Sequence, residues 1–321
     1  MSGVWPVRRL LLPLTPLYRL GLAVRGVGLR TGLEPVKRLN APTIGIGGLS
    51  AGGSGKTPLT IALARALTQR GLTVDVLSRG YGRQSAKAMR VDKNGSAEEF
   101  GDEPLLIARE AGVPVFVAAQ RYKAGRLAEE AHAAQVHLLD DGYQHRQLHR
   151  DVNILLVDAR DFDDFLLPAG NLREPISAMR RAQIVAIPAG DVELEARVKA
   201  RGWFGPIWRL RRRMDVPHIE GPVVAFCGIA RSGQFFDGLE AGGLKLAERI
   251  AFPDHHRYTA GDLERLRAAS AAGGAALITT EKDRVRLGAM GDSLAIETVR
   301  LRMEIEDERE AVDELIERAG L

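Results

Sequence analysis

The residues whose types and spacing most clearly indicate a chemical role form a glycine-rich turn, which lies between an apolar run at 43–46 and a helical pattern at 58–70. Glycines allow backbone N–H groups to turn toward phosphate oxygens, and the amino end of the following helix adds positive potential. The strict pattern of such a loop begins with glycine, whereas this chain has serine at that position. We predict a nucleotide-binding phosphate loop formed by Ser50, Ala51, Gly52, Gly53, Ser54, Gly55, Lys56 and Thr57.

The same loop predicts a metal ion. Lys56 is expected to reach the terminal phosphates and the Thr57 hydroxyl to bind Mg²⁺, while a neighbouring strand supplies a carboxylate. The apolar run 136–139 ends in Asp140 and Asp141, and adjacent carboxylates repel each other unless a cation lies nearby. A solvated turn at Asp141-Gly142 is the alternative. A kinase, a GTPase switch, an ATPase and an ATP-dependent ligase all remain open at this point.

Elements able to position these residues are visible as short apolar runs separated by segments of helix length. Continuous apolar strands in this arrangement predict a mainly parallel sheet covered on both faces, here a P-loop NTPase-like α/β core. Helices are predicted at 58–70, 121–135 and 260–272, and the segment 197–218, which lacks clean periodicity, is interpreted as a connector. The predicted strands are 43–46, 73–77, 114–117, 136–139, 153–157, 184–187, 223–226 and 276–279.

The chain length of 321 residues allows two modest domains. The strand–helix pattern restarts after a soft boundary at about 216–221. We therefore predict an N-terminal helical segment at 1–35, a P-loop kinase core at 36–215 and a smaller C-terminal α/β domain at 216–321.

The N-terminal segment is apolar but interrupted by arginines. Its longest uncharged stretch, 10–18, is about half of what a membrane-spanning helix needs. Apolar residues recur at three- and four-residue steps, and Trp5 and Tyr18 are expected to act as interfacial anchors. The stripe consists of Leu17, Leu20, Val24 and Val27. This pattern favours contact with an anionic membrane surface, and the alternative is a helix packed on the body of the protein.

Composition excludes some functions. The net charge of +4 and the pI of about 9.3 permit an anionic partner without requiring nucleic acid. No basic cluster interleaved with aromatic residues is present, so nucleic acid is not an expected partner. The single cysteine, Cys227, lies in an apolar run, which excludes an internal disulfide and indicates an inert core residue in a reducing compartment.

A series of short motifs in a fixed order is more specific than any one of them. The motifs are Ser78-Arg79-Gly80-Tyr81-Gly82, Gly101-Asp102-Glu103-Pro104, Asp140-Asp141-Gly142-Tyr143-Gln144-His145, Leu167-Pro168-Ala169-Gly170, Leu172-Arg173-Glu174-Pro175, Asp254-His255-His256 and Thr280-Glu281-Lys282-Asp283. With the phosphate loop, this series resembles the tetraacyldisaccharide 4′-kinase family of the lipid A pathway, from the N-terminal segment to about residue 287.

The resemblance implies an ATP-dependent lipid kinase. Its reaction would transfer the γ-phosphate of ATP to the 4′-hydroxyl of a tetraacylated glucosamine disaccharide 1-phosphate, forming lipid IVA. It also implies a protein on the cytoplasmic face of the bacterial inner membrane, held there by the N-terminal segment, with no obligate protein partner evident. Because an acylated substrate stays in the bilayer, the enzyme must approach that surface. A soluble P-loop kinase or synthetase of a cofactor pathway and a nucleotide-switch ATPase are the alternatives.

The resemblance also suggests roles for residues. Asp102 is the candidate base for the sugar hydroxyl, with His255, preferred over His256, paired to it. Without the resemblance, Asp102 would be interpreted as a helix cap. The segment 280–283 would either contact the nucleotide base or form a capping turn. The candidates for the metal shell are Asp141, Asp140 and Glu103; those for support of that shell or the phosphates are His145 and Glu174; those for substrate contact are Arg79, Tyr81, Arg121 and Arg173.

Overall fold

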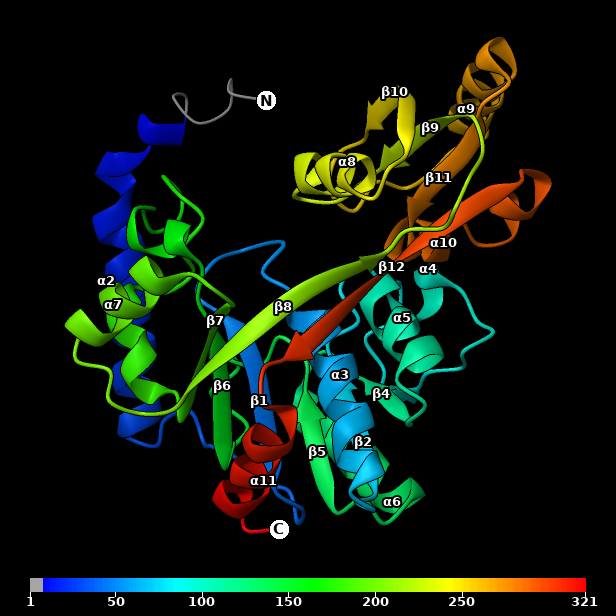
Figure 1. The fold of residues 1–321 in the computed structure, drawn as a ribbon. Helices are drawn as coiled ribbons and strands as arrows, with labels where there is room; N and C mark the ends of the chain where they lie inside the picture. The colour runs from blue at the N-terminus through cyan, green and yellow to red at the C-terminus, as the bar shows by residue number, and fades with distance from the viewer. Residues whose placement is uncertain (1–7) are drawn as a thin grey trace.

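The computed structural model describes residues 8–321 (Figure 1). The α-helices are α2 Thr15–Arg30, α3 Lys56–Gln69, α4 Ala97–Phe100, α5 Asp102–Glu110, α6 Arg121–Ala131, α7 Val192–Ala200, α8 Ser232–Ala241, α9 Ala260–Gly273, α10 Glu281–Leu287 and α11 Glu308–Ala319. Short 3₁₀ turns are η1 Leu12–Leu14, η2 Ala159–Phe162, η3 Ile176–Arg181 and η4 Gly288–Ser293. The strands are β1 Thr43–Gly48, β2 Val74–Ser78, β3 Met89–Arg90, β4 Val115–Val117, β5 Val136–Leu139, β6 Val152–Leu156, β7 Ile184–Pro188, β8 Ile207–Asp215, β9 Pro222–Cys227, β10 Lys245–Ala251, β11 Ala276–Thr280 and β12 Ile296–Ile305.

All strands belong to one sheet with the order β10-β9-β11-β12-β8-β7-β6-β1-β5-β2-β4-β3. Pairing is parallel except between β12 and β8 and between β3 and β4. The mainly parallel α/β sheet predicted from the sequence is therefore confirmed, because each predicted strand overlaps an observed one. β1 lies between β5 and β6, so the loops after β1 and β5 meet at the same edge of the sheet.

The buried apolar clusters include a large one around β1, here called the first core, and one around β9, here called the second core, and β8 and β12 contribute residues to both. The first half of β12 pairs with β11, and its second half runs antiparallel to β8 (Figure 1). β8 in turn pairs with β7 in parallel. α11 then returns to the core around β1, where Val312 and Leu315 are fully buried. We propose a boundary near residue 216, with α11 belonging to the first part. Cys227 is buried in the second core, as predicted, and burial raises the pKa of its thiol to about 12.

The interpretation of 197–218 as a connector was wrong. This stretch contains the end of α7 and the whole of β8. The side chains of Trp208 and Leu210 are both buried along β8, but the arginines at 209 and 211–213 hide this period of two in the sequence. Several of these arginines pair with acidic residues that are distant in the chain; Arg213, for example, lies 3.5 Å from Glu304 on β12, and Arg209 lies 2.8 Å from Glu195 on α7. Pairing with a strand far along the chain is not visible in a local pattern.

The N-terminal helix α2 both packs on the protein and exposes an apolar stripe. Tyr18 points inward, where its hydroxyl donates to the Arg173 carbonyl at 2.9 Å, so its predicted role as a membrane anchor was wrong. Trp5 lies outside the described residues. Among residues 8–321, no helix is both long and apolar enough to cross a bilayer. The exposed fractions of the predicted stripe are 68% for Leu17, 58% for Leu20, 63% for Val24 and 55% for Val27.

Candidate active site

The loop between β1 and α3 has the backbone that a phosphate loop requires. Gly52, Gly53 and Gly55 have φ values of 81°, 53° and 89°, a region that only glycine enters without strain. Gly55 is the N-cap of α3, so the helix begins at Lys56 and directs its amino end at the loop. The Lys56 Nζ donates to Ser54 Oγ at 3.2 Å. Ser50, the departure from the strict pattern, is buried in a bridge to Leu172.

Asp141 lies beside this loop in a charged cluster. Its backbone has a φ of 48°, which is rare outside glycine and is found most often at functional sites. Its carboxylate accepts two hydrogen bonds from Arg173, at 2.8 and 2.7 Å, and lies 3.6 Å from Lys56 Nζ. Burial alone would raise the pKa of Asp141, but Lys56 and Arg173 hold it well below its usual range.

The pKa of Asp140 is shifted in the opposite direction from that of Asp141. Its Oδ1 accepts from the Thr60 hydroxyl at 3.1 Å, whereas its buried Oδ2 has no hydrogen-bond partner among the described residues. Burial, together with the charges of Glu103 and Asp141, raises its pKa to about 7. A bound cation would supply the missing partner and relieve this repulsion.

The donor set therefore fits Mg²⁺ in a particular way. Within the described part of the chain, no three or more His, Cys, Asp or Glu side chains form a preformed metal site. Mg²⁺ commonly binds through one or two carboxylates, with waters and substrate phosphates completing its shell. The unpartnered oxygen of Asp140, next to a glycine-rich phosphate loop, matches that requirement.

Asp102 and His255 are brought together although they lie far apart in the chain. The His255 Nδ1 lies 3.0 Å from Asp102 Oδ2, and His255 has a positive φ of 57°. His256 instead lies 3.0 Å from Asp262, so the preference for His255 agrees with the geometry. The helix-cap interpretation of Asp102 was wrong, because Gly101 is the N-cap of α5.

Two basic side chains surround Asp102. Arg286 Nε donates to Asp102 Oδ2 at 2.7 Å, and Lys282 Nζ lies 2.8 Å from Glu103 and 3.9 Å from Asp102. Burial would raise the pKa of Asp102, but the hydrogen bond from His255 and the charges of Lys282 and Arg286 hold it well below its usual range. The charge of Glu103 also raises the pKa of Asp140, so the Asp102–His255 pair and the metal candidates belong to one charged region.

The remaining predicted residues line the same region. The Tyr81 ring is exposed, with its centroid 5.3 Å from that of His255. Arg121 is buried with no hydrogen-bond partner at Nε among the described residues, and burial, with the charge of Arg79, lowers its pKa to about 10. Burial and nearby arginines lower the pKa of His145 to about 4, so it is neutral at physiological pH. Arg79 is exposed at the carboxyl end of β2.

Glu174 lies next to Arg181 and Gln144. Its Oε2 accepts from Arg181, and Gln144 Nε2 lies 3.4 Å away. Thr57 is half-buried in the first turn of α3. Thr280 caps α10 by accepting from the Asp283 backbone N–H at 3.1 Å, so the capping alternative for 280–283 is confirmed.

Sequence reasoning missed three basic residues near the site, Arg212, Arg231 and Arg286, and included Lys282 only as part of the motif at 280–283. Arg212 Nη2 donates to the Gly53 carbonyl at 3.1 Å, and a Cβ at Gly53 would lie 2.9 Å from Arg231 Cγ. Lys282 and Arg286 lie four residues apart, which places both on one face of α10. That spacing was visible in the sequence. Arg212 was hidden in the misinterpreted strand, and nothing local distinguishes Arg231.

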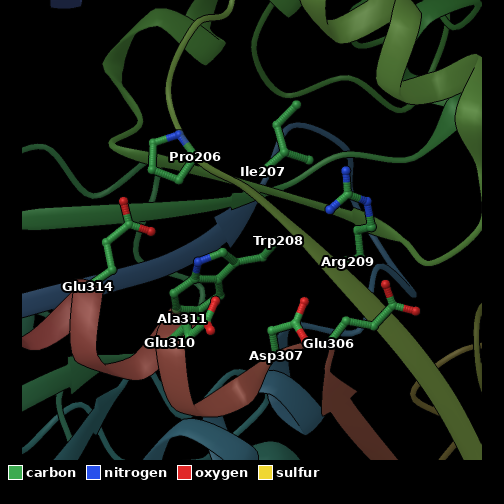
Figure 2. Close-up of a pocket in the computed structure, with 9 residues that line it drawn as sticks. All are labelled: Pro206, Ile207, Trp208, Arg209, Glu306, Asp307, Glu310, Ala311 and Glu314. Atoms are coloured by element: carbon green, nitrogen blue, oxygen red, sulfur yellow. The ribbon is translucent and has the colours of Figure 1, made fainter.

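A separate cavity of about 470 Å³ lies between β8 and α11 (Figure 2). It contains none of the predicted site residues. Its acidic lining would repel phosphate groups, so it is not the nucleotide site. The residues that line it are Pro206, Ile207, Trp208, Arg209, Glu306, Asp307, Glu310, Ala311 and Glu314.

Known proteins resemble this chain over nearly its whole length. A family model described as tetraacyldisaccharide-1-P 4′-kinase matches residues 7–320. The tetraacyldisaccharide 4′-kinase of Koribacter versatilis is 42% identical over 317 residues, which cover 95% of this chain and 97% of that protein. The one from Anaeromyxobacter dehalogenans strain 2CP-C is 41% identical over 312 residues, covering 87% and 82%.

A solved structure agrees with the sequence relatives. The crystal structure of LpxK from Aquifex aeolicus in complex with ATP has a TM-score of 0.78 to this chain and is 34% identical to it. The superposition covers 98% of this chain and 99% of that one.

Proposed function

Because the chain belongs to the tetraacyldisaccharide-1-P 4′-kinase family, we propose that it transfers the γ-phosphate of ATP to the 4′-hydroxyl of a tetraacylated glucosamine disaccharide 1-phosphate. This is the step of lipid A biosynthesis that forms lipid IVA. The observation that carries the proposal is the position of the Asp102–His255 pair beside the residues around the phosphate loop, within a chain that matches the family throughout.

The phosphate loop holds the nucleotide. In the bound state, backbone N–H groups of the glycine-rich turn at 52–57 and the amino end of α3 would contact the phosphates, and Lys56 would neutralise part of their charge. Asp140 and Asp141 would hold Mg²⁺, with Thr57 and Glu103 completing the protein side of its shell. When bound, Mg²⁺ supplies charge stabilisation to the phosphates during transfer.

The sugar hydroxyl must lose a proton as it attacks the γ-phosphate. Asp102 is the proposed base, and His255, 3.0 Å away, shares the proton with it. Contacts with Lys282 and Arg286 keep Asp102 ionised before the reaction.

The arginines around the site suit an acceptor that already carries a phosphate. Arg173 holds Asp141 in place, while Tyr81 and Arg79 lie at the exposed rim. Arg121 has an unpartnered Nε and is buried beside the aspartates, which suits contact with an anionic group. His145 and Glu174 would support these arginines from behind.

The exposed stripe on α2 supports docking to the cytoplasmic face of the inner membrane. Its apolar side chains face away from the protein, on a helix whose other face is fixed through Tyr18. Replacing Leu20 and Val24 with glutamate should abolish co-sedimentation with anionic liposomes. Val192→Glu, at an exposed apolar residue on α7, is the matched control and should still bind. Unchanged binding of the double variant would refute membrane docking through this stripe.

The reaction is tested by following radiolabelled phosphate from ATP to the tetraacyl disaccharide 1-phosphate in detergent micelles with Mg²⁺. Lys56→Ala and Asp102→Ala should each lose at least about 10²-fold in rate. No labelled glycolipid from well-folded protein would rule out the kinase. Activity on a water-soluble acid instead would favour a cofactor-pathway enzyme. ATP turnover that survives Asp102→Ala would favour a nucleotide switch.

A further inference from the structure

Helix α10 faces the amino end of α5, where Asp102 lies. Two of its basic side chains reach that end: Lys282 contacts Glu103, and Arg286 contacts Asp102. Arg286 is the more buried, with only 5% of its side chain exposed. A buried guanidinium directed at the proposed base requires an explanation beyond surface charge.

The contacts of Arg286 are directed at both members of the proton-accepting pair. Its Nε and Nη2 lie 2.7 and 2.6 Å from Asp102 Oδ2, and Nη2 lies 3.3 Å from His255 Nδ1. Asp102 Oδ1 accepts from the Glu103 backbone N–H at 2.9 Å. The carboxylate is therefore fixed at both oxygens, and its rotation is restricted.

The guanidinium is itself held from behind. Its Nη1 lies 3.0 Å from Asp283 Oδ1 and donates to the Gly228 carbonyl. Asp283 is fully buried and also accepts from the Gly228 N–H and the Tyr258 hydroxyl, each at 3.0 Å. Arg286 thus connects a rigid buried anchor to the catalytic pair, as supporting residues do at preorganised sites.

This arrangement also determines how His255 is presented. His255 Nδ1 and Asp102 Oδ2 lie 3.0 Å apart, so a carboxylate that cannot rotate also restricts the orientation of the His255 ring. His255 is one-third exposed, and its ring contacts Tyr81 at the rim of the site.

Resting on the proposed kinase function, we propose that Arg286 is a positioning residue: it fixes the Asp102 carboxylate, and through it the His255 ring, in the orientation that accepts the sugar hydroxyl proton. Arg286 acts through the pair and touches neither ATP nor the acceptor. Its removal should therefore lower kcat and leave the KM values nearly unchanged.

The first measurement is steady-state kinetics of Arg286→Gln and Arg286→Lys. Arg286→Gln should lose about 10²-fold in kcat, the scale of a misplaced catalytic group, with KM for ATP and acceptor within about threefold. Lysine keeps the charge but not the planar fork, so Arg286→Lys should recover only part of the loss. Arg284→Gln is the control: Arg284 lies on the same helix, bonds the Gly288 carbonyl and pairs with Asp292. It should retain parental kcat.

A double-mutant cycle separates positioning from plain structural support. If Arg286 acts through Asp102, adding Arg286→Gln to Asp102→Ala should cost less than about threefold further in kcat, because the carboxylate that Arg286 positions is already absent. Losses that multiply in the double variant, or full kcat in Arg286→Gln, would overturn the inference. If Arg286→Gln does not fold, the same cycle with Arg286→Lys decides in the same way.

Chemical rescue gives an independent readout. Guanidine added to Arg286→Ala should restore kcat in a saturable manner, while the Arg284→Gln control should not respond. Absence of rescue in folded Arg286→Ala would count against the inference. Inactivity of the parent protein itself would instead reject the kinase function on which the inference rests.

Discussion

Replacing Asp140 with asparagine should change how the stability of the metal-free protein depends on pH. Burial, with the charges of Glu103 and Asp141, raises the folded-state pKa of Asp140 to about 7, whereas the pKa of an unfolded aspartate is about 3.9. Between these values the folded state holds a proton that the unfolded state has lost. The free energy of unfolding therefore falls as pH rises through this interval and levels off above the folded pKa.

The size of the effect follows from the width of that interval. About 1.4 kcal/mol is lost per pH unit, and about one and a half units separate pH 5.5 from the folded pKa, which gives about 2 kcal/mol. Asparagine does not titrate. From pH 5.5 to pH 8.5, Asp140→Asn should therefore lose about 2 kcal/mol less stability than the parent, since titrating groups elsewhere are shared and cancel.

Urea unfolding with a chelator present, at both pH values, measures this difference directly. Equal losses of stability in the parent and in Asp140→Asn would refute the reasoning. At pH 8.5, added Mg²⁺ and ATP should raise the unfolding midpoint of the parent, because ligand binding stabilises the folded state. The same addition should have a smaller effect on Asp140→Asn, which lacks the carboxylate proposed to hold the metal.

Three further outcomes can be checked separately. Arg173→Ala removes both hydrogen bonds to Asp141 and should lower the free energy of unfolding by about 1–3 kcal/mol; a parental value in urea unfolding would contradict this. Gly53→Ala forces a positive φ on alanine and places a methyl group 2.9 Å from the Arg231 side chain, so calorimetry should show weakened ATP binding. Gly71 also has a positive φ but has open space around it, so the control Gly71→Ala should bind ATP normally. Cys227 should react with a thiol reagent at pH 8 only after denaturation, because burial raises its pKa to about 12; rapid labelling of the native protein would be the opposite result.

The parallel half of the sheet was predictable because its strands are continuous apolar runs. The run 184–187 on β7, for example, is entirely apolar and buried on both faces, so its pattern is evident without information from elsewhere in the chain. β8 was not predictable in this way, because its arginines pair with acidic residues that lie elsewhere in the chain, such as Glu304 on β12 and Glu195 on α7. Such pairs depend on a fold that a local pattern does not reveal.

The site residues also differ in whether local sequence could predict them. Lys56, Asp141 and Asp102 occur in short motifs whose chemistry is evident from residue type. The pairing of Asp102 with His255 joins segments far apart in the chain, and the resemblance to a family supplied it, not spacing. Arg286 has no motif at all, because its position depends on the buried Asp283 behind it.

The return of α11 to the first core has a consequence for biosynthesis. Val312 and Leu315 fill the same core as β1 and α3, but they leave the ribosome only after all of β9–β11 has been made. Early-synthesised domains usually fold while translation continues. Here the nucleotide-binding half would remain short of part of its core until the last turns of the chain emerge. Until then its apolar core residues would be exposed to solvent and to chaperones, while the part that contains β9–β11 can already fold.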